Sequence, residues 1–331
     1  MSKQTLPPAF VTQSIDLAQP RLGTRVHVCS DEFFAACERM LQPQEAVFID
    51  GKFDDNGKWM DGWETRRRRN GGHDWAIIQL GHAGVIHGVD LDTSHFTGNY
   101  PPAASLQACN SPVPDADTCW TTLIDIIELQ GDRHHYLTVD NDQVWTHLRL
   151  NIFPDGGIAR LRVYGRVHCD WASKDQTASL DLLSMENGGR AIAWNDAHFG
   201  AVANLIAPGK GANMGDGWET RRRREPGNDW CILELGHRGI IEEVLIDTAY
   251  FKGNYPDRCS IQAASVEATT TQSLISQSMF WAELLPAQKL QMDQQFHFRE
   301  ELQEIGPITH IRLNIFPDGG VSRLRLFGKI A

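Results

Sequence analysis

The nine residues D-G-W-E-T-R-R-R-R at positions 61–69 recur without a single change at positions 216–224. The same offset carries G-N-Y-P at 98–101 onto 253–256. Matches of this length within one chain are not a coincidence, so the chain contains two copies of one unit. Units of about 150 residues are domains, because solenoid repeats run to only about 20–50 residues.

Further matches indicate the limits of the two copies. The segment R-L-N-I-F-P-D-G-G at 149–157 recurs at 312–320, and upstream Asp16 matches Asp181. We therefore expect a first domain at residues 16–166, a linker at residues 167–180 and a second domain at residues 181–329.

The composition is that of a globular protein, with 41% hydrophobic and 22% charged residues. A formal net charge of −11 argues against nucleic acid as a partner, because nonspecific binding to phosphates needs a basic surface. No segment has the roughly 20 apolar residues that cross a membrane, and the N-terminus lacks the pattern of a signal peptide. We expect a cytoplasmic protein without membrane association.

The cysteines are seven in number and show no C-x-x-C spacing. An odd number at scattered positions predicts neither a disulfide framework nor a zinc site. They do not recur between the copies, so we interpret them as apolar filler.

Short apolar or alternating runs bounded by Gly, Pro, Asn and Asp dominate both copies, which indicates an all-β fold. Residues 74–80 and 229–235 are nearly continuous apolar runs that suit central strands, each ending at a Gly-His. In residues 147–153, Leu148, Leu150 and Ile152 alternate with polar side chains, and a second alternating strand follows the turn P-D-G-G. Only short helices are expected, for example across residues 31–41 with Asp31 as the cap.

The order of these motifs resembles the galactose-binding-like, discoidin-type jelly rolls. Their full set, present twice, resembles the allantoicase family over about nine tenths of the chain. That resemblance implies two tandem jelly-roll β-sandwich domains and the hydrolysis of allantoate to ureidoglycolate and urea in allantoin degradation. It makes allantoate the small-molecule partner, and we expect a homo-oligomer.

The chemistry of allantoate suggests roles for the repeated residues. Its carboxylate is best held by the planar guanidinium of arginine, and its ureido groups need amide-like donors and acceptors. We expect the substrate-binding residues to be Asp61, Arg66, Arg68, Asn99, Tyr100, Asp216, Arg221, Arg223, Asn254 and Tyr255. Two plainer interpretations remain open: Asp-Gly and G-N-Y-P are common turn sequences, and the arginines could form an ion-pair network with Glu64 and Glu219.

Release of urea needs a proton donor for the leaving nitrogen and a base or electrophile for water. We expect the catalytic residues to be Glu64, Glu219, His82 and His237. The two histidines could instead be loop residues bonded to the backbone. The polar strand faces His147, Arg149, Asn151 and His310, Arg312, Asn314 are the other candidate walls, with a solvated sheet face as the alternative.

No metal site is expected, because no H-x-H or H-E-x-x-H spacing occurs and most histidines do not recur. No cofactor is therefore required by the sequence, although a divalent cation could activate water. A different class of function also remains: two sandwiches could bind a sugar without catalysis, using Trp63 and Trp218 as stacking platforms. A third possibility is that only one copy is catalytic.

Overall fold

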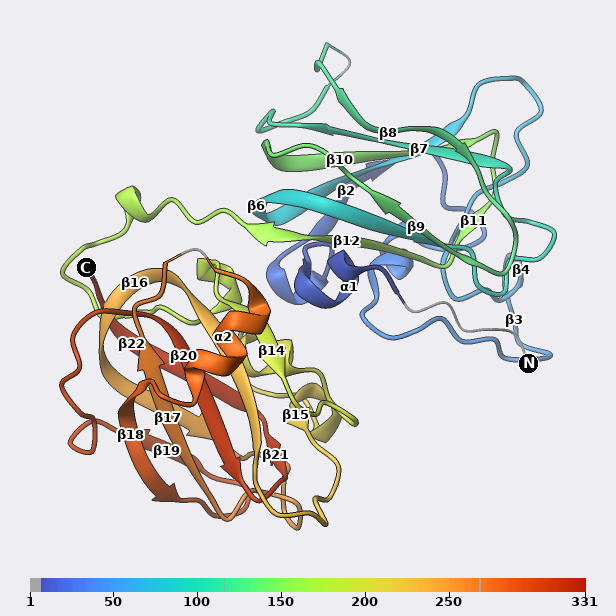
Figure 1. The fold of residues 1–331 in the computed structure, drawn as a ribbon. Coiled ribbons are helices and arrows are strands. Elements are labelled where there is room, and N and C mark those ends of the chain that lie inside the picture. The colour runs from blue at the N-terminus through green and yellow to red at the C-terminus, as the bar shows by residue number, and fades with distance from the viewer. Residues whose placement is uncertain (1–6, 116, 268) are drawn as a thin grey trace. The chain divides into compact units, whose positions relative to one another are not determined.

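The computed structural model describes residues 7–115, 117–267 and 269–331. The chain separates into two compact units, residues 1–168 and residues 169–331, and the regular secondary structure of each is mainly β-strand (Figure 1). This confirms the predicted all-β class with two tandem β-sandwiches.

The first unit contains one eight-stranded sheet system with the order β1-β12-β6-β10-β7-β8, and β2 and β9 also pair with β6. Its strands are β1 (Ile15–Asp16), β2 (Arg25–Cys29), β3 (Phe53–Asp54), β4 (Gly57–Lys58), β5 (Trp63–Glu64), β6 (Asp74–Asp92), β7 (Ala103–Cys109), β8 (Thr121–Glu128), β9 (His134–Thr138), β10 (Val144–Phe153), β11 (Gly157–Ile158) and β12 (Arg160–Val167).

The second unit repeats this topology as β13-β22-β16-β20-β17-β18, with β14 and β19 paired to β16. Its strands are β13 (Leu180–Asp181), β14 (Arg190–Trp194), β15 (Trp218–Glu219), β16 (Asp229–Asp247), β17 (Arg258–Ala264), β18 (Ala282–Lys289), β19 (Gln295–Phe298), β20 (Ile308–Phe316), β21 (Gly320–Val321) and β22 (Arg323–Ile330).

The strand β6 connects both layers of its sandwich. Its first half pairs with β2 and β10, and its second half pairs with β12 and β9. The expectation that this strand ends at Gly81-His82 is therefore wrong: β6 continues through both residues for 19 residues in all. A side chain at Gly81 would collide with the carbonyl oxygen of Leu22, which explains the glycine at this passage.

The predicted strand, turn and strand around P-D-G-G is present, but its two strands do not pair with each other. β10 and β12 both pair with β6, at different halves of that strand. The alternation predicted for β10 is confirmed, because Leu148, Leu150 and Ile152 are fully buried. The opposite face of β10, with His147 and Asn151, is buried, so the alternative of a solvated sheet face is wrong.

The helices are short, as expected. They are α1 (Ala9–Gln13), α2 (Thr271–Ser278) and the 3-10 turns η1 (Pro20–Leu22), η2 (Cys37–Leu41), η3 (Trp171–Ser173), η4 (Met185–Asn187), η5 (Val202–Ile206) and η6 (Met214–Asp216). Of the helix predicted across residues 31–41, the 3-10 turn η2 is present, but residues 31–36 are not helical and Asp31 is not a helix cap. The carboxylate of Asp31 instead accepts hydrogen bonds from the backbone and guanidinium of Arg66.

Two tryptophans of the repeated motif lie in the core. Trp63 and Trp218 are fully buried, and each indole Nε1 donates a hydrogen bond to a backbone oxygen, that of Asp31 at 2.8 Å and that of Asp196 at 2.9 Å. Neither ring can therefore serve as a stacking platform for a sugar.

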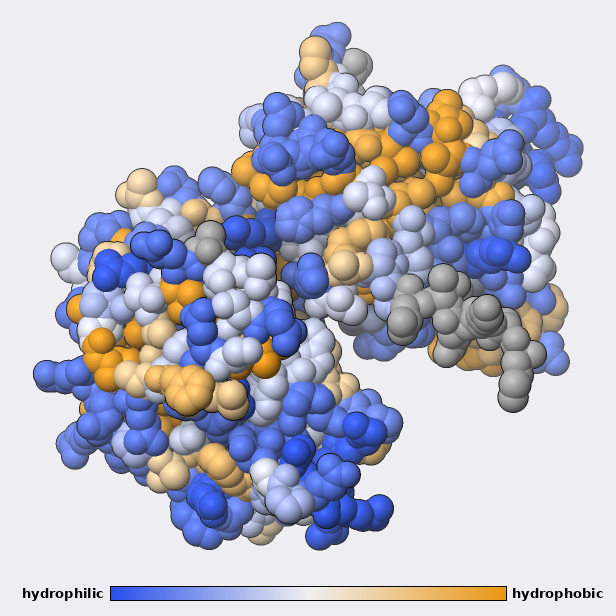
Figure 2. All heavy atoms as spheres, viewed as in Figure 1, coloured by the Kyte–Doolittle hydropathy of each residue, from blue (hydrophilic) through white to orange (hydrophobic). Residues whose placement is uncertain are grey.

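In the face shown in Figure 2, hydrophilic residues cover much of both units, and hydrophobic residues form a band across the first unit. No helix among the described residues is long and apolar enough to cross a membrane. All seven cysteines are free thiols, and Cys37, Cys109, Cys231 and Cys259 are buried.

Candidate functional site

The repeated motifs converge at one end of each sandwich. The backbone N–H of Gly157 in P-D-G-G donates to the carbonyl oxygen of Asn99 in G-N-Y-P at 2.7 Å, and Gly320 donates to Asn254 at the same distance. A side chain at Gly156, whose φ is +146°, would meet the backbone of Tyr100. G-N-Y-P is therefore a turn that packs on a second turn.

Glu64 lies at this junction. It is on the short strand β5, directly opposite Gly157 of β11. The side-chain amide of Asn99 donates to Glu64 Oε1 at 2.7 Å, and burial raises the pKa of this carboxyl. The structure thus brings together two of the predicted site residues.

The second unit reproduces the pair. Glu219 lies on β15 opposite Gly320 of β21, and the amide of Asn254 donates to Glu219 Oε1. Glu219 is only 9% exposed, so its carboxylate needs this partner. Neither glutamate forms an ion pair with the arginines of its own motif among the described residues.

The arginines of the first unit bind aspartates. Arg66 Nη2 lies 2.7 Å from Asp31 Oδ1, and Arg68 Nη2 lies 2.7 Å from Asp74 Oδ1. No strand continues through residues 65–69, so the predicted basic strand is wrong, and the guanidinium of Arg66 projects into solvent at 64% exposure.

The same segment lines a pocket in the second unit. Arg221 and Arg223 bind Asp196 and Asp229, at 2.7 and 2.8 Å. The pocket has a volume of about 360 Å³, and its lining residues are Asp196, Arg221, Arg222, Arg223, Arg224, Glu225 and Asp229. Within the described part of this unit, Arg222 and Arg224 have no carboxylate partner.

The predicted aspartates have an internal role. Asp61 Oδ2 lies 2.7 Å from Arg160 Nη2, and Asp216 Oδ2 lies 2.7 Å from Arg323 Nη2. Both arginines are at most 3% exposed, so these ion pairs hold the loops in front of the motif.

The predicted tyrosines are half-buried. The ring of Tyr100 packs against the apolar cluster of Met60, Phe96 and Ala159, so much of its surface is used in packing. Tyr255 is its counterpart at the same position of the second G-N-Y-P.

The structure does not bring the histidines to the glutamates. The backbone N–H groups of Thr65 and Asp74 both donate hydrogen bonds to the turn at 154–157, so Asp74 lies near the glutamate. His82 lies eight residues beyond Asp74 along β6, which is about 25 Å at the rise per residue of a strand. His237 holds the corresponding position on β16; its Nδ1 hydrogen-bonds with the Arg238 carbonyl oxygen at 2.7 Å, and its ring lies 5.1 Å from Trp171. His237 is thus bonded to the backbone, but it lies within a strand and not in a loop.

The polar face of β10 is mostly buried: His147 and Asn151 are 2% and 4% exposed, and Arg149 is half-buried. Two of its buried atoms, His147 Nε2 and Arg149 Nε, have no hydrogen-bond partner. Burial lowers the pKa of both groups. The Arg149 guanidinium lies 5.1 Å from the ring centroid of Trp75, in a cation–π contact.

This face is continuous with the arginine segment. His73 Nε2 lies 3.2 Å from Asn151 Oδ1, and the next residue along the chain, Asp74, binds Arg68. The sequence showed both surfaces as separate candidates, but not that the start of β6 joins them. The recurrence of Asp31 as Asp196 and of Asp74 as Asp229 was the available signal for the arginine partners.

The chain matches known proteins over nearly its whole length. The model of the allantoicase repeat matches twice, at residues 15–168 and 180–331. A probable allantoicase of Burkholderia mallei is 58% identical over 325 residues, covering 98% of this chain and 96% of the relative. A probable allantoicase of Pseudomonas syringae is 57% identical, covering 96% of each chain.

Solved structures agree with these matches. The crystal structure of allantoicase from Saccharomyces cerevisiae is 34% identical, covers 95% of this chain and 93% of its own, and superimposes with a TM-score of 0.80. A second allantoicase structure is 33% identical with a TM-score of 0.81 and covers 97% of this chain and 95% of its own. The two repeats, their shared motifs and these full-length matches together place the chain in the allantoicase family.

Proposed function

We propose that the reaction of this enzyme, hydrolysis of allantoate to ureidoglycolate and urea, takes place beside the arginine segment of each repeat. The observation that carries this location is the pocket of the second unit, which is lined by the whole run of four arginines. Its volume of about 360 Å³ falls in the range of small-molecule sites, about 300–1,000 Å³.

The charges of the pocket suit a carboxylate. Arg221 and Arg223 are held by aspartates, whereas Arg222 and Arg224 have no ion-pair partner among the described residues. A guanidinium binds a carboxylate through two parallel hydrogen bonds. Arg222 and Arg224 are therefore the proposed ligands of the allantoate carboxylate, in place of the arginines that the sequence favoured.

The ureido groups are rich in N–H donors. Asp196 and Asp229 line the same pocket and offer carboxylate oxygens as acceptors. Each aspartate also holds an arginine, so its oxygens are fixed in position before substrate arrives. This arrangement supports recognition of a small molecule that carries both a carboxylate and amide-like nitrogens.

Glu64 and Glu219 are the proposed proton carriers. Cleavage breaks the bond between the central carbon and one ureido nitrogen, and that nitrogen takes a proton from the carboxyl group and leaves in urea. The hydroxyl of water bonds to the central carbon, and the remaining water proton restores the carboxyl group. The raised pKa of Glu64 keeps its proton available closer to neutral pH, which suits a general acid. Asn99 and Asn254 position the two carboxyls.

The test is urea release from allantoate by purified variants. Glu64→Gln and Glu219→Gln together should lower kcat by about 10²- to 10⁴-fold, the usual contribution of general acid–base catalysis. Arg222→Met with Arg224→Met should raise KM at least about tenfold, since charge-assisted hydrogen bonds contribute about 1.5–3 kcal/mol each. The single glutamate variants apportion activity between the repeats.

Glu243→Gln is the matched control, because Glu243 binds Arg299 on the surface of β16 and lies in neither proposed site. It should retain wild-type kcat and KM. Wild-type turnover by the double glutamate variant would reject Glu64 and Glu219. The search for proton carriers would then move to the faces of His147 and His310.

We further propose that the enzyme is a cytoplasmic homo-oligomer that does not bind nucleic acid. The net charge of −11 supports the last point. The odd number of cysteines without a disulfide framework supports a reducing compartment. Exposed apolar side chains at Val47, Phe48, Ile49 and Phe53 support a self-association surface in the first unit.

A further inference from the structure

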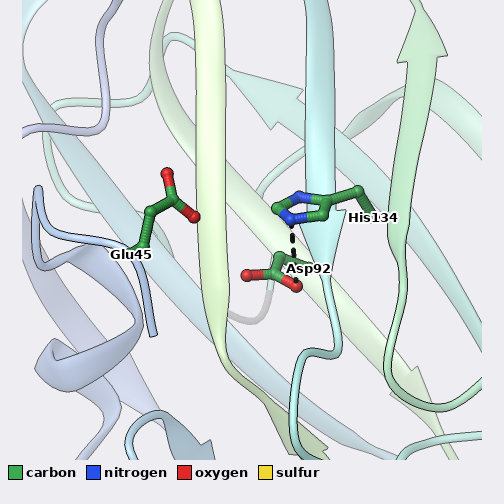
Figure 3. Close-up of side chains that lie close together, drawn as sticks. All are labelled: Glu45, Asp92 and His134. Atoms are coloured by element: carbon green, nitrogen blue, oxygen red, sulfur yellow. Dashed lines mark ion pairs between the residues drawn. The ribbon is translucent and has the colours of Figure 1, made fainter. Parts of the chain in front are cut away.

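Three side chains from distant parts of the first unit meet away from the arginine segment. Glu45 lies on the loop after η2, Asp92 ends β6 and His134 begins β9 directly opposite Asp92. One ligand atom from each lies within 4.8 Å of the others. Figure 3 shows the two carboxylates and the imidazole turned toward one another.

The ring of His134 is oriented for a further ligand. Its Nδ1 hydrogen-bonds with Asp90 Oδ2 at 2.7 Å, whereas its Nε2 lies 3.9 Å from Asp92 Oδ1. The second distance is too long for a hydrogen bond, but it suits two atoms that each lie about 2.0–2.2 Å from one metal ion. A carboxylate on the distal ring nitrogen is the usual support of a metal-binding histidine.

Two carboxylate oxygens in this cluster have no hydrogen-bond partner. Asp92 Oδ2 and Asp90 Oδ1 are buried and unsatisfied, and their residues are only 1% and 3% exposed. Buried polar atoms without partners are rare because their desolvation is not compensated. Burial raises the pKa of Asp92, which reflects the same penalty.

We propose that Glu45, Asp92 and His134 Nε2 bind a divalent transition-metal ion in the first unit, with Asp90 as the positioning residue for His134. One imidazole and two carboxylates favour an ion such as Zn²⁺ over Mg²⁺ or Ca²⁺, which prefer oxygen ligands alone. The exposed Glu45 leaves the site open to solvent. This proposal is independent of the catalytic one.

Charge argues in the same direction. The carboxylates of Glu45, Asp90 and Asp92 surround the single imidazole of His134. A bound divalent cation offsets this negative charge and offers a partner to carboxylate oxygens that lack one.

The second unit identifies the counterpart of Glu45. Arg160 Nη2 donates to the carbonyl oxygen of Glu45 at 3.3 Å, and Arg323 Nη2 donates to that of Lys210 at the same distance. The two residues therefore hold equivalent places in their loops. A lysine ammonium at this place opposes a cation.

The counterparts of the other two ligands are satisfied without metal. Asp92 pairs with His134 across β6 and β9, and Asp247 pairs with Gln295 across β16 and β19. The amide of Gln295 donates to Asp247 Oδ2 at 2.7 Å. The second unit thus supplies the substitutions that test the first.

The experiment is calorimetric titration of the full chain, freed of metal by chelation, with Zn²⁺. We expect one site in the wild type that His134→Gln and Glu45→Lys each weaken at least about tenfold. Asp90→Asn should weaken it about 10- to 100-fold, the usual effect of removing the support of a metal-binding histidine. Mg²⁺ should not compete at equal concentration.

His297→Gln is the matched control, because His297 lies on β19 and hydrogen-bonds with Glu243 at 2.6 Å. It should bind Zn²⁺ like the wild type. Saturating Zn²⁺ should also raise the Tm of the wild type but not of Glu45→Lys, which changes only an exposed loop residue. Absence of a Zn²⁺ site in the wild type, or affinity unchanged in both His134→Gln and Glu45→Lys, would overturn the proposal.

Discussion

The two units share their internal ion pairs and differ at the surfaces around them. In both, an aspartate holds the first arginine of the motif, an asparagine holds the glutamate, and a buried arginine holds the preceding loop. The carboxylate cluster of the first unit becomes Lys210 and Gln295 in the second. The two copies therefore share the residues that hold the arginine segment and differ in the neighbouring cluster around His134.

The clearest difference lies on the polar faces of β10 and its counterpart β20. In the second unit, Arg312 Nη1 donates to Ser278 Oγ of α2 at 2.8 Å, and its Nε donates to Asn314 at 3.0 Å. Among the described residues of the first unit, the Arg149 side chain has a stacking contact with Trp75 and no hydrogen-bond or ion-pair partner. In the second unit α2 thus supplies a hydrogen-bond acceptor to Arg312, whereas Arg149 Nε in the first unit has no acceptor.

The largest expected effect tests the shared framework. Arg160→Ala should lower the free energy of unfolding of the first unit by about 3–5 kcal/mol, because it removes the ion-pair partner of Asp61 and leaves several loop carbonyls without this donor. Arg323→Ala should do the same to the second unit. Urea denaturation measures both losses.

The exposed Arg166 provides the control, and Arg166→Ala should change the free energy of unfolding by no more than about 0.5 kcal/mol. A much smaller loss for one buried arginine than for the other would show that the two loops are not equivalent.

The next prediction tests the difference between the polar faces of β10 and β20. Arg312→Met should lower the free energy of unfolding by about 1–3 kcal/mol, because Ser278 and Asn314 lose a buried hydrogen-bond donor. Arg149→Met should be neutral or stabilising, since an apolar side chain replaces a desolvated charge without an ion pair. Equal losses in thermal or urea unfolding would remove the proposed difference between the faces.

The smallest effect concerns the exposed ion pairs. Although partial burial acts in the opposite direction, hydrogen bonds from Arg66 lower the pKa of Asp31. A lowered folded-state pKa gives stability that is present above about pH 4 and is lost as the pH falls through the folded-state pKa. Arg66→Met should therefore raise the folded-state pKa of Asp31, so that less stability is lost as the pH falls.

Carboxyl carbon NMR titration measures the shift directly, and Arg221→Met should shift Asp196 in the same direction. Arg69→Met should leave Asp31 close to its wild-type pKa. A shift in one unit alone would show that the two ion pairs respond to different surroundings.

Much of the fold could be predicted because it is written in local patterns. The repeat, the apolar run of β6 and the alternation of β10 are visible within a few residues. The course of β6 could not be predicted, since a strand that passes through Gly81 and changes its partners looks locally like one that ends there. The expectation that His82 is a catalytic residue rested on a strand that ends at this point.

The site was predictable to the extent that its contacts follow the repeat. Glu64 and Asn99 recur together and do bond. The partner of Arg66 is Asp31, 35 residues earlier, and no spacing rule connects them. In the cluster around His134, Asp92 recurs as Asp247, but Lys210 and Gln295 stand in place of Glu45 and His134, so the internal repeat gave no signal for it.

The buried arginines of β12 and β22 also determine when each repeat can fold. The first strand of the first unit, β1, pairs with β12, and the loop before the D-G-W-E-T motif is held by Arg160 and Arg162 of that same strand. On the ribosome, the early segments therefore wait for residues 160–167 to emerge before they find their partners. The first unit therefore completes its sheet only after β12 has been synthesised, and the second unit likewise waits for β22.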